Sequence, residues 1–309
     1  ESGVMSATSN RHDAVWNARG AAFMVLAMLG FAVEDTFLKL AAQSLPVGQV
    51  LVSFGAFGLV AFSAMAIAAG ETPISPAMLA PVILVRSLFE ITGRLFFMLA
   101  IALTPLSTAS AILQSTPLVV IAGAALYFKE SVGVRRWGAV VVGLGGVLVI
   151  LRPGAEGVGP LSTFAVIATL GFAGRDLATR AAPLSMSHHQ LGVLGFACLA
   201  FAGLVALPFG GAPRLPDAGG AVSLIAASCA GVIGYGSLTT AMRTGEISAV
   251  TPFRYMRLVF AMLTGVAVFH ERPDTLTLVG SAIVVVAGII ALTLSPRRRG
   301  ELAGAARPD

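Results

Sequence analysis

The chain has 309 residues, of which 56% are hydrophobic and only 11% are charged. Soluble globular domains carry about 25% charged residues, so this composition excludes a soluble globular protein and predicts an all-α polytopic membrane protein. The net charge of +5 does not indicate nucleic-acid binding, because the basic residues lie at helix ends and in short loops rather than on one continuous face.

Residues 1–17 are expected to form an N-terminal tail. Glu1 to Val4 precede the first methionine and are interpreted as a remnant of expression cloning, which makes Met5 the expected natural start. No segment before Ala18 has the apolar run and small-residue cleavage site of a signal peptide. The first hydrophobic segment is therefore expected to remain as a membrane span.

Ten segments satisfy the requirement of about 20 mostly apolar residues for a transmembrane helix. They are expected at residues 18–39, 47–69, 78–102, 107–128, 134–151, 160–180, 189–209, 219–241, 247–269 and 275–294. The connections between them are too short to hold a soluble domain.

The distribution of basic residues predicts the orientation. If the N-terminus is cytoplasmic, eleven Lys and Arg residues lie in cytoplasmic loops and tails and four lie in external loops. Both tails, residues 1–17 and 295–309, are therefore expected in the cytoplasm.

An internal repeat divides the spans into two groups of five. Leu29–Asp35 (LGFAVED) returns as Leu170–Asp176 (LGFAGRD), and the offset of 141 positions also aligns Gly93 with Gly234. Such a register indicates a duplication. Because five is odd, the second half is expected to be inserted upside down, which is typical of alternating-access transporters.

The third span carries three charges on one helical face. Arg86, Glu90 and Arg94 are four residues apart, and Glu90 falls about midway along the span. Charges at that depth nearly always face the bundle interior or a wet cavity. We expect them to line a binding site; the alternative is an ion ladder that only fixes helix packing.

The ninth span repeats this theme directly after Pro252. Arg254 and Arg257 are three residues apart and share a helical face. Snorkelling to the cytoplasmic surface is the alternative, and it is weak for Arg257, about ten residues from the helix start. Both arginines are expected at the binding site.

Acidic residues occur in the first and sixth spans. Glu34 and Asp35 lie in the outer third of the first, and Asp176 lies in the inner third of the sixth. Their positions in the repeat place them near opposite mouths of a pathway. Two interpretations stay open: gates, or interfacial ion pairs, with Lys39 and Arg180 as partners.

The fourth span contains Gln114 and Pro117 near its middle. Pro117 is expected to kink the helix. Gln114 is expected to hydrogen-bond across a cavity, and helix packing is an equally good account of it.

Sequence signals for an enzyme or a metalloprotein are lacking. The spans contain no GxSxG, HExxH or DxxD pattern, and His188 and His189 have no evident third ligand. We therefore expect no catalytic residue, metal or cofactor.

The chain resembles the EamA-type exporters of the drug/metabolite transporter superfamily over Arg19 to Pro296. The resemblance rests on four segments: RSLFE, PLSTASAILQSTPL, RRWGAVVVGLGGVLVILRPG and GEISAVTPFRYMRLVFAMLTGVAVFHERP. It implies two five-helix repeats at residues 18–151 and 160–294, a bacterial inner-membrane location, and a central cavity between helices one, three, four, six, eight and nine. Similar proteins include YddG-like amino-acid exporters and carriers of S-adenosylmethionine or riboflavin. This chain lacks the aromatic-rich cavity of an aromatic amino-acid exporter, since its only tryptophans, Trp16 and Trp137, lie outside the core.

The expected function is export of small zwitterionic or anionic metabolites, amino acids first, because four arginines face Glu90 alone in the proposed cavity. A carrier of S-adenosylmethionine, riboflavin or another nucleotide-like metabolite is the alternative, followed by a passive facilitator and, far behind, an intramembrane enzyme. The expected partners are a small-molecule substrate and the lipid bilayer, with protons as candidate coupling ions, no nucleic acid, and a functional monomer. The residues expected to bind substrate are Arg86, Glu90, Arg94, Gln114, Tyr235, Arg254 and Arg257. The expected gating residues are Glu34, Asp35, Lys39, Asp176 and Arg180, and the expected hinges are Pro117 and Pro252.

Overall fold

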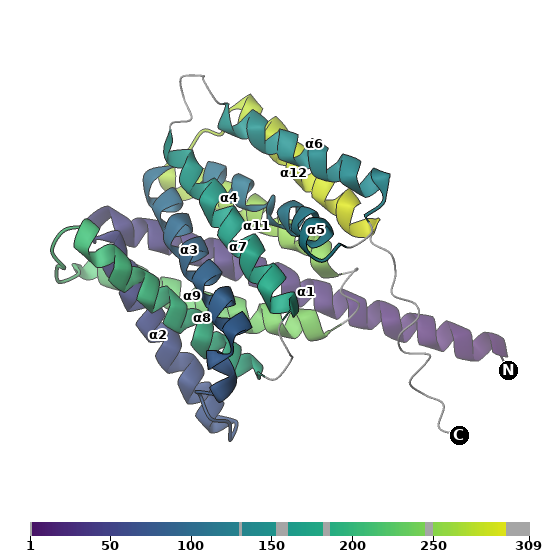
Figure 1. Cartoon of the computed structure of the whole chain (residues 1–309), viewed down its shortest axis with the longest axis horizontal. Helices are drawn as coiled ribbons and strands as arrows, with labels where there is room; N and C mark the ends of the chain where they lie inside the picture. The colour runs from purple at the N-terminus through teal and green to yellow at the C-terminus, as the bar shows by residue number, and fades with distance from the viewer. Residues whose placement is uncertain (1, 130–131, 153–159, 182–185, 245–249, 295–309) are drawn as a thin grey trace.

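The computed structural model describes residues 2–129, 132–152, 160–181, 186–244 and 250–294 (Figure 1). Every regular element in these ranges is helical. The helices are α1 (Ser2–Ser44), α2 (Val47–Ala68), α3 (Pro81–Leu103), α4 (Leu106–Leu113), α5 (Thr116–Tyr127), α6 (Val134–Leu151), α7 (Thr163–Ala181), α8 (His188–Ala206), α9 (Ala218–Arg243), α11 (Met256–Phe269) and α12 (Thr275–Thr293). Four short 3₁₀ turns join them: η1 (Pro76–Leu79), η2 (Pro160–Ser162), η3 (Leu207–Phe209) and η4 (Thr251–Tyr255).

Eight spans of the described chain are long and apolar enough to cross a membrane, with α4 and α5 together forming one of them and η4 and α11 another. The helices α3 and α7 have sufficient length, but each contains three charged residues. The protein is thus an all-helical, polytopic membrane protein. Its outer surface fits this class, since large apolar side chains such as Val60, Leu88 and Leu126 are more than 60% exposed in the isolated chain.

The expected kink in the fourth span is a break. α4 ends at Leu113 and α5 begins at Thr116, with Pro117 in the first turn of α5. Proline fits there because the first turn needs no backbone donor. The ninth span is likewise irregular at its start, where Pro252 lies in the 3₁₀ turn η4 before α11.

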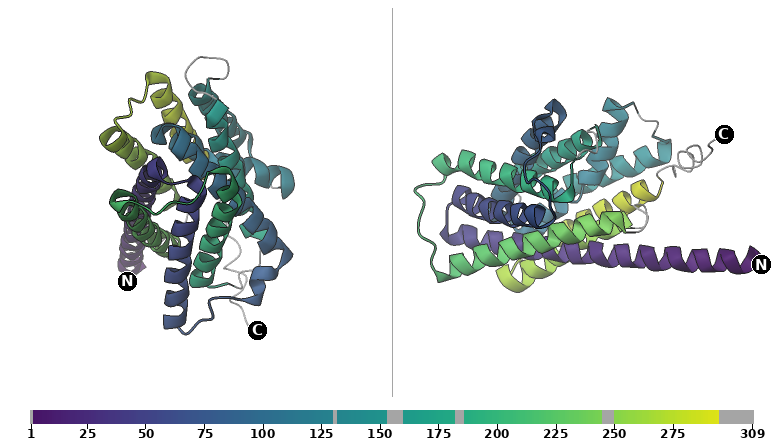
Figure 2. Two further views of the ribbon diagram at one scale, coloured as in Figure 1. Left: turned by 90° about the vertical axis from the view of Figure 1, so that its left-hand side faces the viewer. Right: turned by 90° about the horizontal axis from the view of Figure 1, so that it is seen from below.

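Helices pack in pairs that are distant in sequence. α1 lies along α9, α2 along α8, α3 along α7 and α6 along α12. Figure 2 shows α1 extending beyond the bundle at its N-terminal end, and Figure 1 shows α6 and α12 as a pair at one side. Buried apolar side chains from both halves of the sequence, including Phe54, Met98 and Leu199, share one core.

Two glycine pairs allow close contacts between helices. A Cβ added to Gly30 would stand 2.9 Å from Cα of Gly234, and one added to Gly171 would stand 2.7 Å from Cα of Gly93. These pairs join α1 to α9 and α7 to α3. Small residues allow such close backbone approach, which strengthens van der Waals packing between membrane helices.

Replacing Gly171 by alanine should lower the midpoint of thermal unfolding, because the new Cβ would lie 2.6 Å from the backbone nitrogen of Gly93. Overpacking typically costs about 1–3 kcal/mol. The matched control is Gly236→Ala, where an added Cβ meets nothing within 4 Å. Thermal unfolding of both variants in detergent tests this; equal midpoints would show that α3 and α7 are not held at this separation.

Candidate functional site

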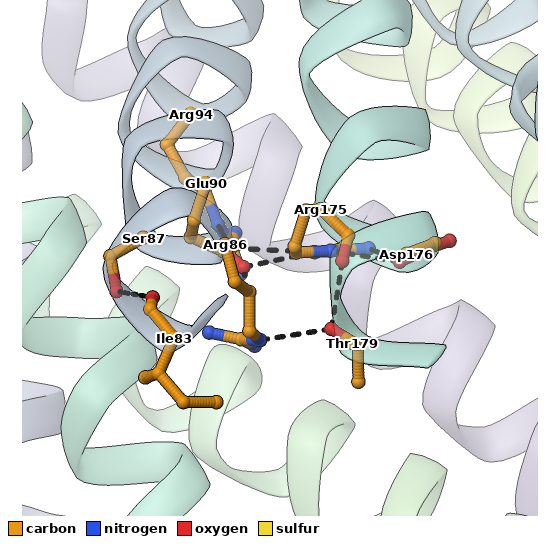
Figure 3. Close-up of polar contacts among 8 residues, drawn as sticks. All are labelled: Ile83, Arg86, Ser87, Glu90, Arg94, Arg175, Asp176 and Thr179. Carbon is orange, nitrogen blue, oxygen red and sulfur yellow. Dashed lines mark hydrogen bonds and ion pairs between the residues drawn. The ribbon is translucent and has the colours of Figure 1, made fainter. Parts of the chain in front are cut away.

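Glu90 lies at the centre of a buried ion-pair network between α3 and α7 (Figure 3). Its carboxylate oxygens are 3.1 Å from Nε of Arg94 and 3.5 Å from Nη2 of Arg86, both on α3. Nη1 of Arg175, on α7, lies 3.3 Å from Oε1 of Glu90. Three guanidinium groups therefore surround one carboxylate, which satisfies a charge that would otherwise be costly inside the bundle.

The network continues along α7. Nη2 of Arg175 lies 2.8 Å from Oδ1 of Asp176, and Nε of Arg86 donates to Oγ1 of Thr179 at 3.0 Å. The guanidinium of Arg175 lies 4.9 Å from the centroid of the Phe172 ring, which is a cation–π contact. Figure 3 shows Arg175 pointing from α7 toward Glu90 on α3.

The network reaches α1 through Arg94. Nη1 of Arg94 lies 3.7 Å from Oε1 of Glu34, whereas its Nε donates to Glu90. Glu34 is 2% exposed. Arg94 thus holds two carboxylates from different helices.

A second buried pair joins α1 to α11. Arg257 donates from Nη2 to both oxygens of Asp35, at 2.9 and 2.7 Å, and from Nε to Oδ2 at 3.1 Å. Its guanidinium also lies between the rings of Phe31 and Phe97, at 5.3 and 5.4 Å. This forked geometry is specific to arginine.

These contacts correct the charge count expected from the sequence. Four arginines and four carboxylates form the two groups of ion pairs, so they are formally neutral. Arg254 adds a positive charge outside these pairs, because among the described residues its guanidinium forms neither an ion pair nor a hydrogen bond. The positive surplus therefore comes from the arginines outside these pairs that line the cavity, Arg254 and Arg136.

Arg254 lines a cavity of about 180 Å³ between α5, α6, α7, η4 and α12. The polar groups and the proline around this cavity are Thr116, Pro117, Arg136, Asp176, Thr251 and Arg254. The described lining includes no aromatic side chain. Drug-sized ligands occupy about 300–1,000 Å³, so this volume suits a small metabolite or the polar end of a larger one.

Gln114 connects the broken fourth span to this cavity. At the C-terminal end of α4, its Nε2 donates to the backbone carbonyl of Arg254 at 3.0 Å. It thus bonds to backbone rather than spanning a cavity, and it fixes the turn that carries Arg254. Tyr235 instead packs in an aromatic cluster, with its ring 5.2 Å from that of Phe62.

Lys39 pairs with a different carboxylate from the two expected. Its Nζ lies 3.0 Å from Oε1 of Glu271 and donates to the carbonyl of Thr104 at 2.8 Å. Glu34 and Asp35 bind the arginines described above instead. The gating interpretation of Lys39 therefore requires Glu271 as its partner.

Glu271 caps α4 from a distant loop. The backbone amides of Leu106 and Ser107 donate to its carboxylate at 2.5 and 3.0 Å, and the Ser107 hydroxyl donates at 2.7 Å. α4 has no cap of its own, because Pro105 precedes it. Burial alone would raise the pKa of Glu271, but the hydrogen bonds from Ser107 and Leu106 and the charge of Lys39 outweigh it and hold the pKa below its usual value.

Arg175 and Glu271 are the two groups that sequence reasoning left out of the site. Arg175 could have been found from the sequence, because charged residues inside a membrane need partners and this rule applies to Arg175 as it does to Glu90. The side chain of Arg180, expected beside Asp176, lies outside the described residues; Asp176 pairs with Arg175.

No group of three or more His, Cys, Asp and Glu residues that could hold a metal ion occurs in the described ranges. Nδ1 of His189 lies 3.1 Å from Oε2 of Glu71.

The sequence profile of the EamA-like transporter family matches residues 18–152 and again residues 161–294. The pseudopaline exporter CntI of Pseudomonas aeruginosa is 29% identical over 91% of this chain and 97% of that protein. The S-adenosylmethionine uptake transporter of Rickettsia conorii is 27% identical over 65% of this chain and 68% of that protein. The riboflavin transporter of Rhizobium johnstonii is 26% identical over 90% of this chain and 92% of that protein.

A solved crystal structure aligns with this protein over 87% of this chain and 98% of the other chain. The TM-score is 0.59 and the sequence identity is 17%, which shows a shared fold. The family match covers nearly the whole chain in two parts. The chain therefore belongs to the EamA-like transporter family of the drug/metabolite transporter superfamily, and it is a multi-pass membrane transporter rather than an enzyme.

Proposed function

We propose that this protein is a secondary transporter of the bacterial inner membrane that exports small zwitterionic or anionic metabolites, with amino acids first. The position of Arg254 and Asp176 on the wall of one cavity carries this proposal. Arg254 has no ion-pair partner among the described residues, so its planar fork is available to a carboxylate. The Asp176 carboxylate, 29% exposed, is placed to accept from a substrate ammonium.

The cavity lining favours amino acids over the alternatives. The relatives include an S-adenosylmethionine carrier and a riboflavin carrier, whose substrates contain flat ring systems. Ring systems bind well against aromatic side chains, and the described lining offers none. A nucleotide-like substrate is therefore the second candidate.

We propose ten spans in two inverted repeats, with α3 and α7 as the two additional spans. The close glycine contacts support this arrangement. Gly30 contacts Gly234, and Gly171 contacts Gly93. Gly171 is 141 positions after Gly30, and Gly234 is 141 positions after Gly93, so the two contacts are exchanged copies of one another. A two-fold axis in the membrane plane would produce this exchange.

Alternating access then requires two mouths that open in turn. With both tails in the cytoplasm, the cavity lies in the cytoplasmic half and the contact of Lys39 with Glu271 lies at the outer mouth. In this proposal the contact of Lys39 with Glu271 holds the outer mouth closed. Pro117 and Pro252 lie at the two helix irregularities, and Gln114 links these through the Arg254 carbonyl. They are our proposed hinges, and we propose a functional monomer.

Uptake into proteoliposomes tests the substrate class. Radiolabelled leucine, glutamate, S-adenosylmethionine and riboflavin are compared at equal concentration, with empty liposomes as the control. We expect saturable flux of leucine or glutamate. Flux of riboflavin alone would favour the alternative, and no saturable flux of any probe would contradict the proposal.

Replacing Glu271 by glutamine should open the outer mouth. The substitution weakens the bond to Lys39 and the cap on α4, so a cysteine introduced by Thr108→Cys, where the native side chain is 7% exposed, should react faster with an external impermeant maleimide. Cys198 and Cys229 are replaced in this background. Arg272→Gln is the matched control, because Arg272 is an exposed charge beside Glu271.

Lowering the pH should also open the outer mouth. The pKa of Glu271 is lowered in the closed state, so its stabilisation is complete above the ordinary pKa of a glutamate and is lost as pH falls through the lowered value. Equal labelling rates in Glu271→Gln and the parent protein would show that this contact does not close the mouth.

A further inference from the structure

Four carboxylates lie within the described helical spans, and their partners differ greatly. Asp35 receives three hydrogen bonds from Arg257. Glu90 contacts three guanidinium groups. Two nitrogens of Arg175 contact the carboxylate of Asp176. Glu34 has one cation at 3.7 Å and no hydrogen bond from any described residue.

The surroundings of Glu34 also disfavour a charge. It is 2% exposed, and its Oε2 would lie 3.0 Å from a Cβ placed on Gly231 of α9. The ring of Phe54, on α2, would lie 2.9 Å from the same added Cβ. Burial of an ionised carboxylate with a single distant partner is costly, so the neutral acid is an accessible form here.

Charged groups act on Glu34 from three sides. α3 contributes Arg94, α11 contributes Arg257, and its own helix contributes the neighbouring Asp35. Arg257 is engaged by Asp35, and Arg94 donates its better hydrogen bond to Glu90. α9 and α2 present Gly231 and Phe54, which carry no charge.

A continuous chain of ion pairs connects Glu34 to the cavity. Arg94 joins Glu34 to Glu90 at 3.7 and 3.1 Å. Arg175 joins Glu90 to Asp176 at 3.3 and 2.8 Å. Asp176 lines the cavity.

We propose that Glu34 binds the proton of the transport cycle, and that the chain through Arg94 and Arg175 transmits its charge state to the cavity. This inference rests on the proposed transport function. Loss of the Glu34 charge leaves four arginines against three carboxylates in these ion-pair groups. The resulting change of charge alters the affinity of the cavity for an anionic group, so proton binding at Glu34 and binding of a substrate carboxylate are coupled.

Infrared difference spectra of the purified protein, recorded between mildly acidic and mildly alkaline buffer, provide the first test. A protonated carboxylic acid shows a carbonyl stretch that shifts in deuterated buffer. We expect this band in the parent protein and its loss in Glu34→Gln. Asp176→Asn should retain it, because the band is assigned to Glu34 and Asp176 lies on a different helix, paired with Arg175.

A band that survives in Glu34→Gln overturns the assignment, whichever metabolite is carried. Glu34→Asp keeps a carboxyl group at this position and should retain a band, which separates loss of the acid from loss of the fold. Absence of any such band in the parent protein also overturns the assignment.

The second test measures flux in proteoliposomes with an equimolar mixture of radiolabelled leucine, lysine and glutamate. An imposed pH gradient should change the initial rate for the parent protein. In Glu34→Gln the rates with and without the gradient should become equal, with exchange still measurable. A gradient effect that persists in Glu34→Gln contradicts the inference, whereas absence of all flux in the parent contradicts the proposed function, and the infrared test still decides on Glu34.

Discussion

Replacing Arg254 by glutamine should raise the apparent Kd for glutamate by about ten-fold to a hundred-fold, because a hydrogen bond to a charged group contributes about 1.5–3 kcal/mol. Arg254 is partly buried, lines the cavity, and forms no ion pair with another described residue. Its removal therefore leaves no buried carboxylate without a counterion, and the protein should still fold.

Arg254→Lys distinguishes charge from geometry. Lysine keeps the positive charge but loses the planar fork that binds a carboxylate through two parallel bonds. We expect binding between that of the parent protein and that of Arg254→Gln. Arg214→Gln is the control, because Arg214 is an exposed arginine in the α8–α9 connection whose recorded hydrogen bonds use only its backbone. Unchanged glutamate binding in Arg254→Gln would remove Arg254 from the site.

Replacing Asp176 by asparagine tests whether this carboxylate binds the ammonium group of the substrate. The substitution should weaken binding of leucine but not of N-acetylleucine, which has the same carboxylate and no ammonium group. A parallel loss for both ligands would mean that Asp176 acts only by holding Arg175 in place. Binding is measured in the purified protein, so that effects on the transport rate do not enter.

The helices were largely predictable from the sequence because a span leaves a simple signal. Apolar runs of about 20 residues locate it, and the expected segments 134–151 and 47–69 match α6 and α2 to within one residue at each end. The break between α4 and α5 was less predictable. Pro117 indicates a weak point, but the same residue occurs in kinked continuous helices.

The partners of the charged residues were not predictable to the same degree. Spacing places Arg86, Glu90 and Arg94 on one face of α3, because helical periodicity is a property of one segment. The contact of Lys39 with Glu271 joins positions 232 residues apart, and it depends on how α1 and the α11–α12 loop are placed by packing. Glu34 and Asp35 were closer in sequence to Lys39, yet the rotation of α1 turns them toward Arg94 and Arg257.

Replacing Glu90 by glutamine should lower the free energy of unfolding by about 3–5 kcal/mol, the usual cost of removing one partner from a buried ion pair. Glu90 is 2% exposed and is the shared partner of Arg86, Arg94 and Arg175. Without its charge, three guanidinium groups lie close together across the contact between α3 and α7. Their mutual repulsion should separate these helices.

A double-variant cycle with Arg175→Met tests this assignment. Arg175→Met alone removes one cation from Glu90, and the combined variant removes the carboxylate together with the interhelical arginine that needs it. If the ion pair between Glu90 and Arg175 joins α3 to α7, the unfolding midpoint of the double variant should lie above the value expected from adding the two single effects. Arg175 also binds Asp176, so each midpoint is measured in an Asp176→Asn background as well. Additive effects in both backgrounds would show that the pair does not couple these helices.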